Sequence, residues 1–207
     1  MSHYFDSTPE VESNKRQVEY RVNGINFAFT TDTAVFSKNA VDKGTDLLIN
    51  TVIDDIKTRG AHKGERLLDL GCGWGIVGIV LKSVFMSFDV SQVDVNSRAI
   101  SLAKENAKNN GVKMEYVSQS DVLSEVPADK MFDIVVTNPP VRAGKQTVFQ
   151  FYEQAYAHME NGASIYVVLQ RKQGAPSSHK KLEELFGNCE DIAISGGYHI
   201  MKSVKGE

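Results

Sequence analysis

The sequence predicts an α/β domain in which a mostly parallel sheet of seven strands carries helices on both faces and ends in an antiparallel hairpin. From residue 66 onward, short apolar runs alternate with helical patterns, an order typical of parallel strands joined by crossover helices. Two β-rich runs around Gly196-Gly197 require at least one antiparallel strand. A glycine-rich turn follows the first strand of the series, and ligands in such folds bind beyond the carboxyl ends of the strands.

The first 60 residues are expected to form a hairpin and one helix, packed on a core of residues 61–207 within one structural domain. Gln17 to Val22 and Ile25 to Thr30 are β-rich runs joined by Asn23-Gly24, a dipeptide that tolerates the positive φ angles of a type I′ turn. Asp46 to Lys57 is predicted to be a helix because its apolar residues recur at helical spacing. These apolar residues are Leu48, Ile49, Val52, Ile53 and Ile56.

The first half of the core is expected to contain three strands and two helices. In chain order they are the strand Arg66 to Leu70, the helix Gly75 to Val84, the strand Phe88 to Val93, the helix Ser97 to Asn110 and the strand Met114 to Gln119. Asn96 is a good N-cap for the second helix because its side chain can accept free backbone N–H groups. Gly111 suits the left-handed residue that closes the same helix.

The second half of the core begins with Phe132 to Thr137, a nearly continuous apolar run that suits a parallel strand buried on both faces. The prolines of Asn138-Pro139-Pro140 end this strand. The elements expected after it are the helix Val148 to His158, a turn at Asn161-Gly162, the strand Ser164 to Gln170, the helix Ser178 to Phe186, and the strands Asp191 to Ser195 and Tyr198 to Val204.

Composition favours an ordinary globular protein, with 42% hydrophobic and 24% charged residues. No apolar run approaches the about 20 residues of a membrane-spanning helix. The N-terminus lacks the basic-then-apolar order of a signal peptide, so we expect a cytoplasmic protein without a membrane partner. Cys72 and Cys189 are expected to be free thiols, and no Cys or His spacing predicts a metal site.

The charge distribution bears on nucleic-acid binding. A net charge of -3 argues against a protein that coats nucleic acid nonspecifically, because such binding needs many Lys and Arg contacts to phosphate. Between residues 142 and 181, however, six basic residues outnumber two acidic ones, Glu153 and Glu160. This basic segment suits RNA contact as well as it suits a solvated surface. Its basic residues are Arg142, Lys145, Arg171, Lys172, Lys180 and Lys181.

The glycine loop Asp69-Leu-Gly-Cys-Gly-Trp-Gly75 follows a strand and opens a helix. Because Gly73 to Gly78 also satisfies GxGxxG, a dinucleotide site has to be weighed against a site for S-adenosyl-L-methionine. Asp69 separates the two cofactors, since its carboxylate would repel a pyrophosphate and would pair with the ammonium of a methionine group. The loop therefore favours S-adenosyl-L-methionine.

Two further acidic residues follow the next two strands. Asp94 can accept hydrogen bonds from both hydroxyls of a ribose, which either cofactor carries. Asp121 is suitably placed to accept from an adenine amino group, although an exposed loop residue or a helix N-cap would account for it too. Within the glycine loop, Trp74 and Cys72 are expected to pack rather than react.

The Asn138-Pro139-Pro140 turn predicts chemistry on an amine nitrogen. The lone pair of a nucleobase or amide nitrogen is delocalised into the adjoining π system, so a catalyst has to hold the nitrogen while the lone pair turns toward the methyl group. The Asn138 side-chain oxygen and the Pro139 carbonyl are two acceptors for its N–H bonds, and the prolines fix φ so that these acceptors converge. Positioning is expected to supply most of the catalysis.

Several motifs beyond the glycine loop resemble one family of enzymes. They are Phe29-Thr-Thr-Asp-Thr-Ala-Val-Phe-Ser37, Val41-Asp-Lys-Gly-Thr-Asp-Leu-Leu48, Asn138-Pro-Pro-Val-Arg-Ala-Gly-Lys145, Gln170-Arg-Lys-Gln-Gly-Ala-Pro176 and Leu185-Phe-Gly187. With the glycine loop, these motifs are spread from residue 29 to residue 187, so the resemblance covers nearly the whole chain. The chain resembles the class I S-adenosylmethionine methyltransferases, and more narrowly the small-subunit (16S) ribosomal RNA guanine-N2 methyltransferases in a stand-alone, single-domain form.

The resemblance implies a Rossmann-like fold and three sets of site residues. Asn138 and Pro139 would hold the guanine amine, with Pro140 as the third residue of the catalytic turn. Val141 stands where many amine methyltransferases carry an aromatic that stacks on a flipped base. The residues implied to line the cofactor pocket are Asp69, Gly71, Cys72, Gly73, Gly75, Asp94, Val95, Asp121, Val122 and Asn138. Those implied to contact substrate are Phe36, Arg142, Lys145, Arg171 and Lys172.

The leading hypothesis is methylation of an exocyclic guanine amine in ribosomal RNA, with the RNA or the small ribosomal subunit as partner. The Asn-Pro-Pro turn equally permits methylation of a protein glutamine amide or a small amine. Two hypotheses of other classes are a nicotinamide-dependent oxidoreductase, suggested by GxGxxG and Asp94, and a non-catalytic RNA-binding module.

Overall fold

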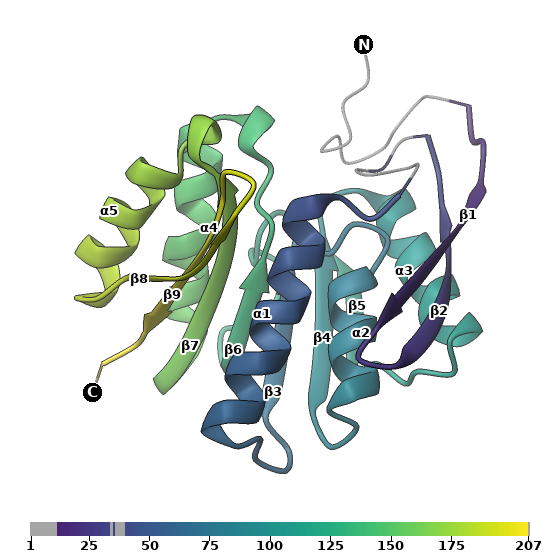
Figure 1. The fold of residues 1–207 in the computed structure, drawn as a ribbon, viewed down its shortest axis with the longest axis horizontal. Helices are drawn as coiled ribbons and strands as arrows, with labels where there is room; N and C mark the ends of the chain where they lie inside the picture. The colour runs from purple at the N-terminus through teal and green to yellow at the C-terminus, as the bar shows by residue number, and fades with distance from the viewer. Residues whose placement is uncertain (1–11, 34, 36–39, 207) are drawn as a thin grey trace.

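A seven-stranded sheet flanked by helices forms the centre of the computed structural model, which describes residues 12–33, 35 and 40–206 (Figure 1). The strand order is β5-β4-β3-β6-β7-β9-β8. Strands β3 to β7 run parallel to one another, and β9 is antiparallel to both of its neighbours. The predicted fold class is confirmed. The strands are β3 (Arg66–Leu70), β4 (Asp89–Asp94), β5 (Tyr116–Gln119), β6 (Phe132–Thr137), β7 (Met159–Gln170), β8 (Glu190–Ser195) and β9 (Tyr198–Val204).

Helices cover both faces of the sheet. Alternate residues of one strand enter different hydrophobic clusters, so that Leu67 packs with α1 and α2 while Leu68 packs with α4 and α5. This alternation explains why the strands are apolar along their whole length. No helix of the described part of the chain is long and apolar enough to cross a membrane. The helices are α1 (Lys43–Arg59), α2 (Ile76–Val84), α3 (Ser97–Asn109), α4 (Lys145–Ala157) and α5 (Ala175–Phe186), with 3-10 turns η1 (Val141–Ala143) and η2 (Arg171–Gln173).

The N-terminal hairpin of β1 (Arg16–Val22) and β2 (Ile25–Thr31) turns at Asn23 and Gly24, whose φ angles of 51° and 79° confirm the predicted positive-φ turn. The hairpin lies against α3, away from the main sheet (Figure 1). Two asparagines one turn apart, Asn106 in α3 and Asn110 directly after it, bind the edge of the hairpin through their side-chain amides. They therefore act as a short strand partner for β2.

These two amides satisfy backbone groups of alternate residues of β2. Asn110 accepts from the Ala28 N–H at 3.1 Å and donates to the Ala28 carbonyl at 2.9 Å. Asn106, which is fully buried, does the same for Thr30 at 2.7 and 2.9 Å. Asn106 also donates to the Trp74 carbonyl at 2.8 Å, so one side chain joins the hairpin to the glycine loop.

Three helices begin three residues before the positions that the sequence predicts. Helix α1 begins at Lys43 because the Asp42 side chain accepts from the N–H groups of Gly44 and Thr45. Gly44 lies in the first turn of this helix, where a Cβ would lie 2.7 Å from the Tyr198 ring. Helices α4 and α5 follow Gly144 and Gly174, which have positive φ and provide no side-chain cap for a sequence pattern to reveal.

The expected turn at Asn161-Gly162 is wrong, because both residues lie within β7. Phe132 pairs with Met159 before the main register of β6 and β7 begins, and the register shifts between Phe132 and Ile134. The Gly162 N–H donates to the Lys205 carbonyl at 2.8 Å, so the positive φ of Gly162 makes an irregularity in a strand rather than a reversal of the chain.

Replacing Asn106 with alanine should lower the free energy of unfolding by about 3 kcal/mol, because buried backbone groups of Thr30 and Trp74 lose their partners. Urea unfolding followed by circular dichroism measures the change. Asn109→Ala, an exposed change on the same helix, is the matched control and should stay within about 0.5 kcal/mol of the parent. Equal effects of the two changes would contradict the bridging role of Asn106.

Candidate active site

A cavity of about 470 Å³ opens at the carboxyl ends of β3, β4 and β6. Its walls come from the glycine loop, the turn after β5, the Asn138-Pro139-Pro140 turn, the start of α1 and the adjoining ends of β7 and β9. Its described lining carries four carboxylates and one cationic side chain, Arg142. This charge balance favours a ligand with positive charge and opposes a pyrophosphate. The carboxylates are those of Asp42, Asp69, Asp94 and Asp121.

The glycines of the loop have different tasks. Gly71, Gly73 and Gly75 all have positive φ, at 74°, 55° and 89°. Gly71 and Gly73 line the cavity, and a Cβ on Gly73 would meet no protein atom within 4 Å, so the missing side chain leaves room for a ligand. Gly75 does not line the cavity. It precedes α2, where a Cβ would lie 3.0 Å from Ala103, so it allows α2 and α3 to pack closely.

Asp69 is buried at the end of β3. Its Oδ2 accepts from the Gly78 N–H and from Gln92 Nε2, both at 2.9 Å. Burial raises the pKa of Asp69 to about 6 and the nearby Asp94 carboxylate adds to the rise, whereas the two hydrogen bonds oppose it. A positively charged group in the cavity would therefore stabilise the ionised form of Asp69.

Asp94 connects the glycine loop to the start of α3. Its Oδ2 accepts from the Gly73 N–H at 2.8 Å and its Oδ1 accepts from the Asn96 N–H at 2.9 Å. Burial raises the pKa of Asp94 although these two bonds lower it. Each carboxylate oxygen can accept more than one bond, so hydroxyl groups of a ligand can still bind here. Asn96 caps α3 as predicted, accepting from the Arg98 and Ala99 N–H groups.

The turn after β5 brings Asp121 and Val122 to the cavity wall. Val122 has a φ of 54°, which is strained for a β-branched residue. Hydrogen bonds hold the turn in this shape, because the Ser120 N–H donates to the Asp94 carbonyl at 3.0 Å and the Asp121 N–H donates to Glu125 at 2.7 Å. The structure thus fixes an acidic side chain at the far edge of the cavity.

The Asn138-Pro139-Pro140 turn lines the opposite wall. Thr137 donates its hydroxyl proton to the Leu70 carbonyl at 2.7 Å, which joins the end of β6 to the end of β3. The Pro139 carbonyl accepts from the Val141 N–H at 2.9 Å, so one of its two lone pairs serves the turn and the other is left for a ligand. Asn138 Nδ2 donates to Thr45 Oγ1 at 3.0 Å.

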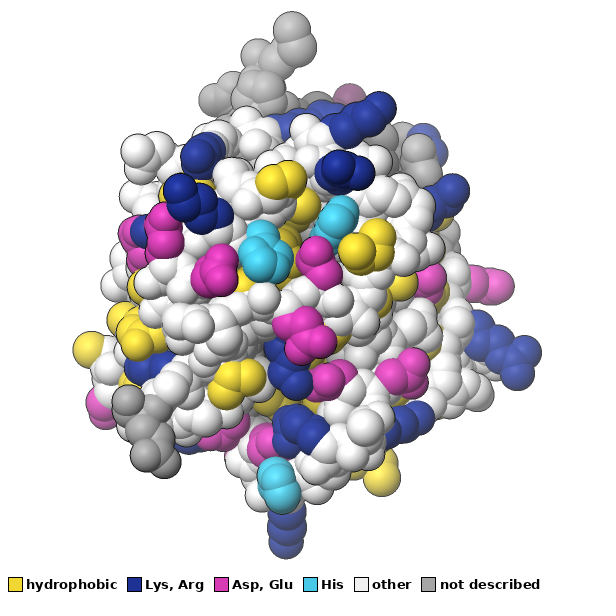
Figure 2. Space-filling view, turned by 60° about the vertical axis from the view of Figure 1, so that its left-hand side comes forward, with side chains coloured by type: hydrophobic (Ala, Val, Ile, Leu, Met, Phe, Trp, Pro, Cys, Tyr) yellow, Lys and Arg dark blue, Asp and Glu magenta, His cyan; other side chains and the backbone are white. Residues whose placement is uncertain are grey.

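The basic residues expected to contact substrate lie at different distances from the cavity. Arg142 lines it, and Arg171 and Lys172 lie exposed in η2 between the lining residues Gln170 and Gln173. Several Lys and Arg side chains stand along the upper edge of the face in Figure 2, where the carboxyl ends of the parallel strands lie.

The other basic residues of this segment have partners on α4 and α5. Lys145 lies over the Phe149 ring, 5.1 Å from its centre, outside the cavity lining. Lys180 and Lys181 pair with Glu184 and Glu153, so part of the basic surplus is neutralised locally. Phe36, the remaining expected contact, lies outside the described residues.

Among the cavity-wall residues that sequence reasoning missed are Asp42, Thr45 and Tyr198. Asp42 and Thr45 stand in a motif that resembles the family, but the late predicted start of α1 gave them no place at the site. Tyr198 begins β9, more than 50 residues beyond the Asn-Pro-Pro turn, and no local pattern marks it. Its ring packs against Gly44 at the start of α1.

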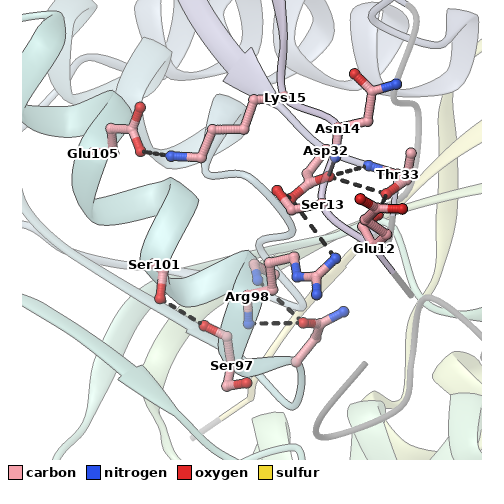
Figure 3. Close-up of polar contacts among 12 residues, drawn as sticks. Glu12, Ser13, Asn14, Lys15, Asp32, Thr33, Ser97, Arg98, Ser101 and Glu105 are labelled. Carbon is pink, nitrogen blue, oxygen red and sulfur yellow. Dashed lines mark hydrogen bonds and ion pairs between the residues drawn. The ribbon is translucent and has the colours of Figure 1, made fainter. Parts of the chain in front are cut away.

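A buried carboxylate anchors the chain on the hairpin side of the cavity (Figure 3). Asp32 accepts from Ser13 Oγ and from the Asn14 N–H, both at 2.7 Å, and lies 3.8 Å from Arg98 on α3. Burial raises the pKa of Asp32, but hydrogen bonds from Ser13, Asn14 and Thr33 outweigh burial and hold the pKa below its usual value. This cluster ties residues 12–15 to α3.

Comparisons with known proteins point to methyl transfer. Residues 26–202 match the family described as methyltransferase small domain. An uncharacterized Bacillus subtilis protein, YbxB, is 39% identical over 98% of both chains. The ribosomal RNA small subunit methyltransferase C of Cronobacter sakazakii is 29% identical over 97% of this chain and 56% of its own.

A solved structure is similar across the same region. It is that of a Thermus thermophilus 16S rRNA N2 methyltransferase, RsmC, in complex with AdoMet and guanosine. The TM-score is 0.83 at 25% identity, over 95% of this chain and 52% of that one. The chain therefore spans about half the length of the ribosomal RNA methyltransferases it matches.

Asp69→Asn should stabilise the protein more at pH 7 than at pH 4.5. The pKa of Asp69 is about 6 in the folded chain and about 3.9 when unfolded, so the folded state binds more protons between these values and its stability falls as pH rises through this window. Urea unfolding at the two pH values measures the difference. Asp89→Asn, an exposed change on β4, is the control, and a pH-independent effect of Asp69→Asn would contradict the buried-acid assignment.

Proposed function

Because the chain belongs to the methyltransferase small domain family and is an S-adenosylmethionine-dependent methyltransferase, we propose that it methylates the exocyclic N2 amine of a guanine in small-subunit ribosomal RNA. One observation carries the proposal. A single cavity joins an acid-rich glycine loop to the Asn138-Pro139-Pro140 turn, so a donor with positive charge and a planar amine can meet there.

Family membership contradicts two hypotheses that the sequence left open. A nicotinamide-dependent oxidoreductase and a non-catalytic RNA-binding module both disagree with the methyltransferase match over residues 26–202. The four carboxylates of the cavity lining also disfavour the pyrophosphate of a dinucleotide. GxGxxG alone could not separate these hypotheses.

The residues at the loop end of the cavity suit S-adenosylmethionine. When bound, this cofactor supplies an electrophilic methyl group carried on a sulfonium. In the proposal, Asp69 compensates the charge of the methionine ammonium, Asp94 accepts from the ribose hydroxyls and Asp121 accepts from the adenine amine. Gly73 leaves room for close approach of the ligand to the backbone.

The Asn138-Pro139-Pro140 turn, at the other end of the cavity, binds the acceptor. Asn138 Oδ1 and the second lone pair of the Pro139 carbonyl accept the two N–H bonds of the guanine amine. These bonds hold the nitrogen so that its lone pair leaves conjugation with the ring and points along the line of displacement. Asn138 therefore orients the acceptor amine, and removing its side chain should affect turnover more than cofactor binding.

The acceptor base has to leave its stack to reach this turn. Val141 cannot supply an aromatic surface, and we propose that Tyr198, which also lines the cavity, does so. Arg142 at the cavity, with Arg171 and Lys172 exposed near its rim, suits an RNA backbone. This arrangement favours RNA over a protein glutamine amide or a small amine, which the Asn-Pro-Pro turn alone would accept.

Purified protein should transfer label from S-adenosylmethionine to RNA of small subunits that lack the modification. Asn138→Ala should lower kcat by about 100-fold, since the amine loses an acceptor at the reacting centre, while the affinity for S-adenosylhomocysteine changes by less than about threefold. Asn161→Ala, exposed near the other end of β7, is the control. Label found only in protein or in a small amine would contradict the RNA assignment, and full activity of Asn138→Ala would contradict the mechanism.

Tyr198→Leu should raise KM for the RNA about tenfold and leave the affinity for S-adenosylhomocysteine unchanged, because an aromatic surface stabilises a stacked base by about 1–3 kcal/mol. Tyr198→Phe keeps the ring and should behave like the parent. Steady-state kinetics on the same subunits measure both. A KM for Tyr198→Leu equal to that of Tyr198→Phe would rule out stacking on this side chain.

A further inference from the structure

The structure assigns a positioning role to Asp42 and Thr45 at the start of α1: together they orient the side-chain amide of Asn138 so that its oxygen, and not its nitrogen, is presented to the acceptor amine. The inference rests on the proposed function for the identity of the acceptor. The orientation itself follows from hydrogen bonds within this chain.

The carboxylate of Asp42 fixes the direction of the Thr45 hydroxyl proton. As the N-cap of α1 it accepts at Oδ1 from the Gly44 N–H at 3.0 Å and from the Thr45 N–H at 3.2 Å. Its Oδ2 accepts the hydroxyl proton of Thr45. A carboxylate only accepts hydrogen bonds, so the single proton of the Thr45 hydroxyl has to point toward Asp42.

The fixed direction of the Thr45 hydroxyl proton determines which group of Asn138 can bind Thr45. With its proton used on Asp42, Thr45 Oγ1 can offer only lone pairs to its other neighbour, which lies 3.0 Å away. Asn138 therefore has to present its NH₂ group to Thr45, because the amide oxygen in that place would set lone pair against lone pair. Thr45 is 6% exposed, so water has little room to replace either partner.

The orientation of the Asn138 amide determines which of its groups meets the acceptor amine. An amine N–H needs an acceptor, and a flipped Asn138 would meet it with two further N–H bonds. Once the nitrogen of Asn138 is held by Thr45, the oxygen is the end that remains for a ligand. Donation to Thr45 also polarises the amide and strengthens its oxygen as an acceptor. Thr45 and Asn138, 93 positions apart in the sequence, thus act together to present the amide oxygen to the acceptor.

The close packing of α1 keeps this arrangement in place. Gly44 lies between Asp42 and Thr45, and a Cβ there would lie 2.7 Å from Tyr198, so the first turn of α1 is held against β9 and the cavity wall. Asn138, which directly follows β6, binds the same turn through Thr45.

Thr45→Val tests the inference because it keeps the shape of the side chain and removes its hydrogen bonds. We expect kcat to fall about tenfold, the loss of one hydrogen bond at the reacting centre, while KM for RNA and the affinity for S-adenosylhomocysteine stay within about threefold. Thr45→Ser retains the hydroxyl and should restore kcat. Thr58→Val is the matched control, since this exposed threonine on the same helix bonds only to the Asp54 carbonyl among the contacts described.

A second measurement needs no substrate. The side-chain amide protons of Asn138 can be followed in nitrogen-edited NMR spectra, with Asn138→Ala identifying the signals. Thr45→Val should shift them and speed their exchange with water, and Thr45→Ser should not. Asp42→Asn should change them as well, because asparagine still caps the helix but can donate to Thr45 and free its proton. That variant also keeps the test available if Thr45→Val is unstable.

Two outcomes would overturn the inference: Asn138 signals that do not respond to Thr45→Val or Asp42→Asn, and a kcat for Thr45→Val equal to that of Thr58→Val. Failure of the proposed function is separate, since parent protein that methylates no RNA while the Asn138 signals respond as expected would reject the substrate and retain the orientation.

Discussion

Four buried or partly buried polar side chains hold the backbone of the glycine loop and of the first turn of α2, and the site depends on them. A tight turn of small residues leaves N–H and C=O groups inside the protein that need partners. Asp94 binds the Gly73 N–H and Asp69 binds the Gly78 N–H, while Gln92 and Asn106 bind the carbonyls of the residues between them. These side chains come from β3, β4 and α3, so the loop keeps its shape only when the three elements are assembled.

Together with two further hydrogen bonds, from Thr137 and to Thr45, these side chains couple the hairpin, the cofactor end and the acceptor end of the cavity. Asn106 joins β2 to the loop, and the edge-to-face contact of Phe29 with Trp74 packs the hairpin beside it. Thr137 fixes the end of β6 to the end of β3, and Thr45 fixes the start of α1 to Asn138. The two ends of the cavity are therefore parts of one hydrogen-bonded framework, which suits catalysis by positioning.

This framework is not optimised for stability. Asp69 and Asp94 are close together, and burial raises the pKa of both, so ionising them in the folded chain has a free-energy cost. Val122 holds a strained backbone conformation on the same cavity wall. Buried acids and a strained residue that face one cavity are typical of a binding site whose ligand supplies the missing interactions.

The sequence by itself determined the fold class, the order of strands and helices, the glycine loop and the Asn-Pro-Pro turn. These features are encoded locally, in hydrophobic periodicity, in Asn23-Gly24 and Asn96, and in residue types that fix φ or supply acceptors. Only the tertiary structure decided that Asn138 is held by Thr45, that Tyr198 reaches the cavity, that Gly75 serves packing and that Asn161-Gly162 continues a strand. Each of these depends on contacts between segments far apart in the chain, so no local pattern could predict them.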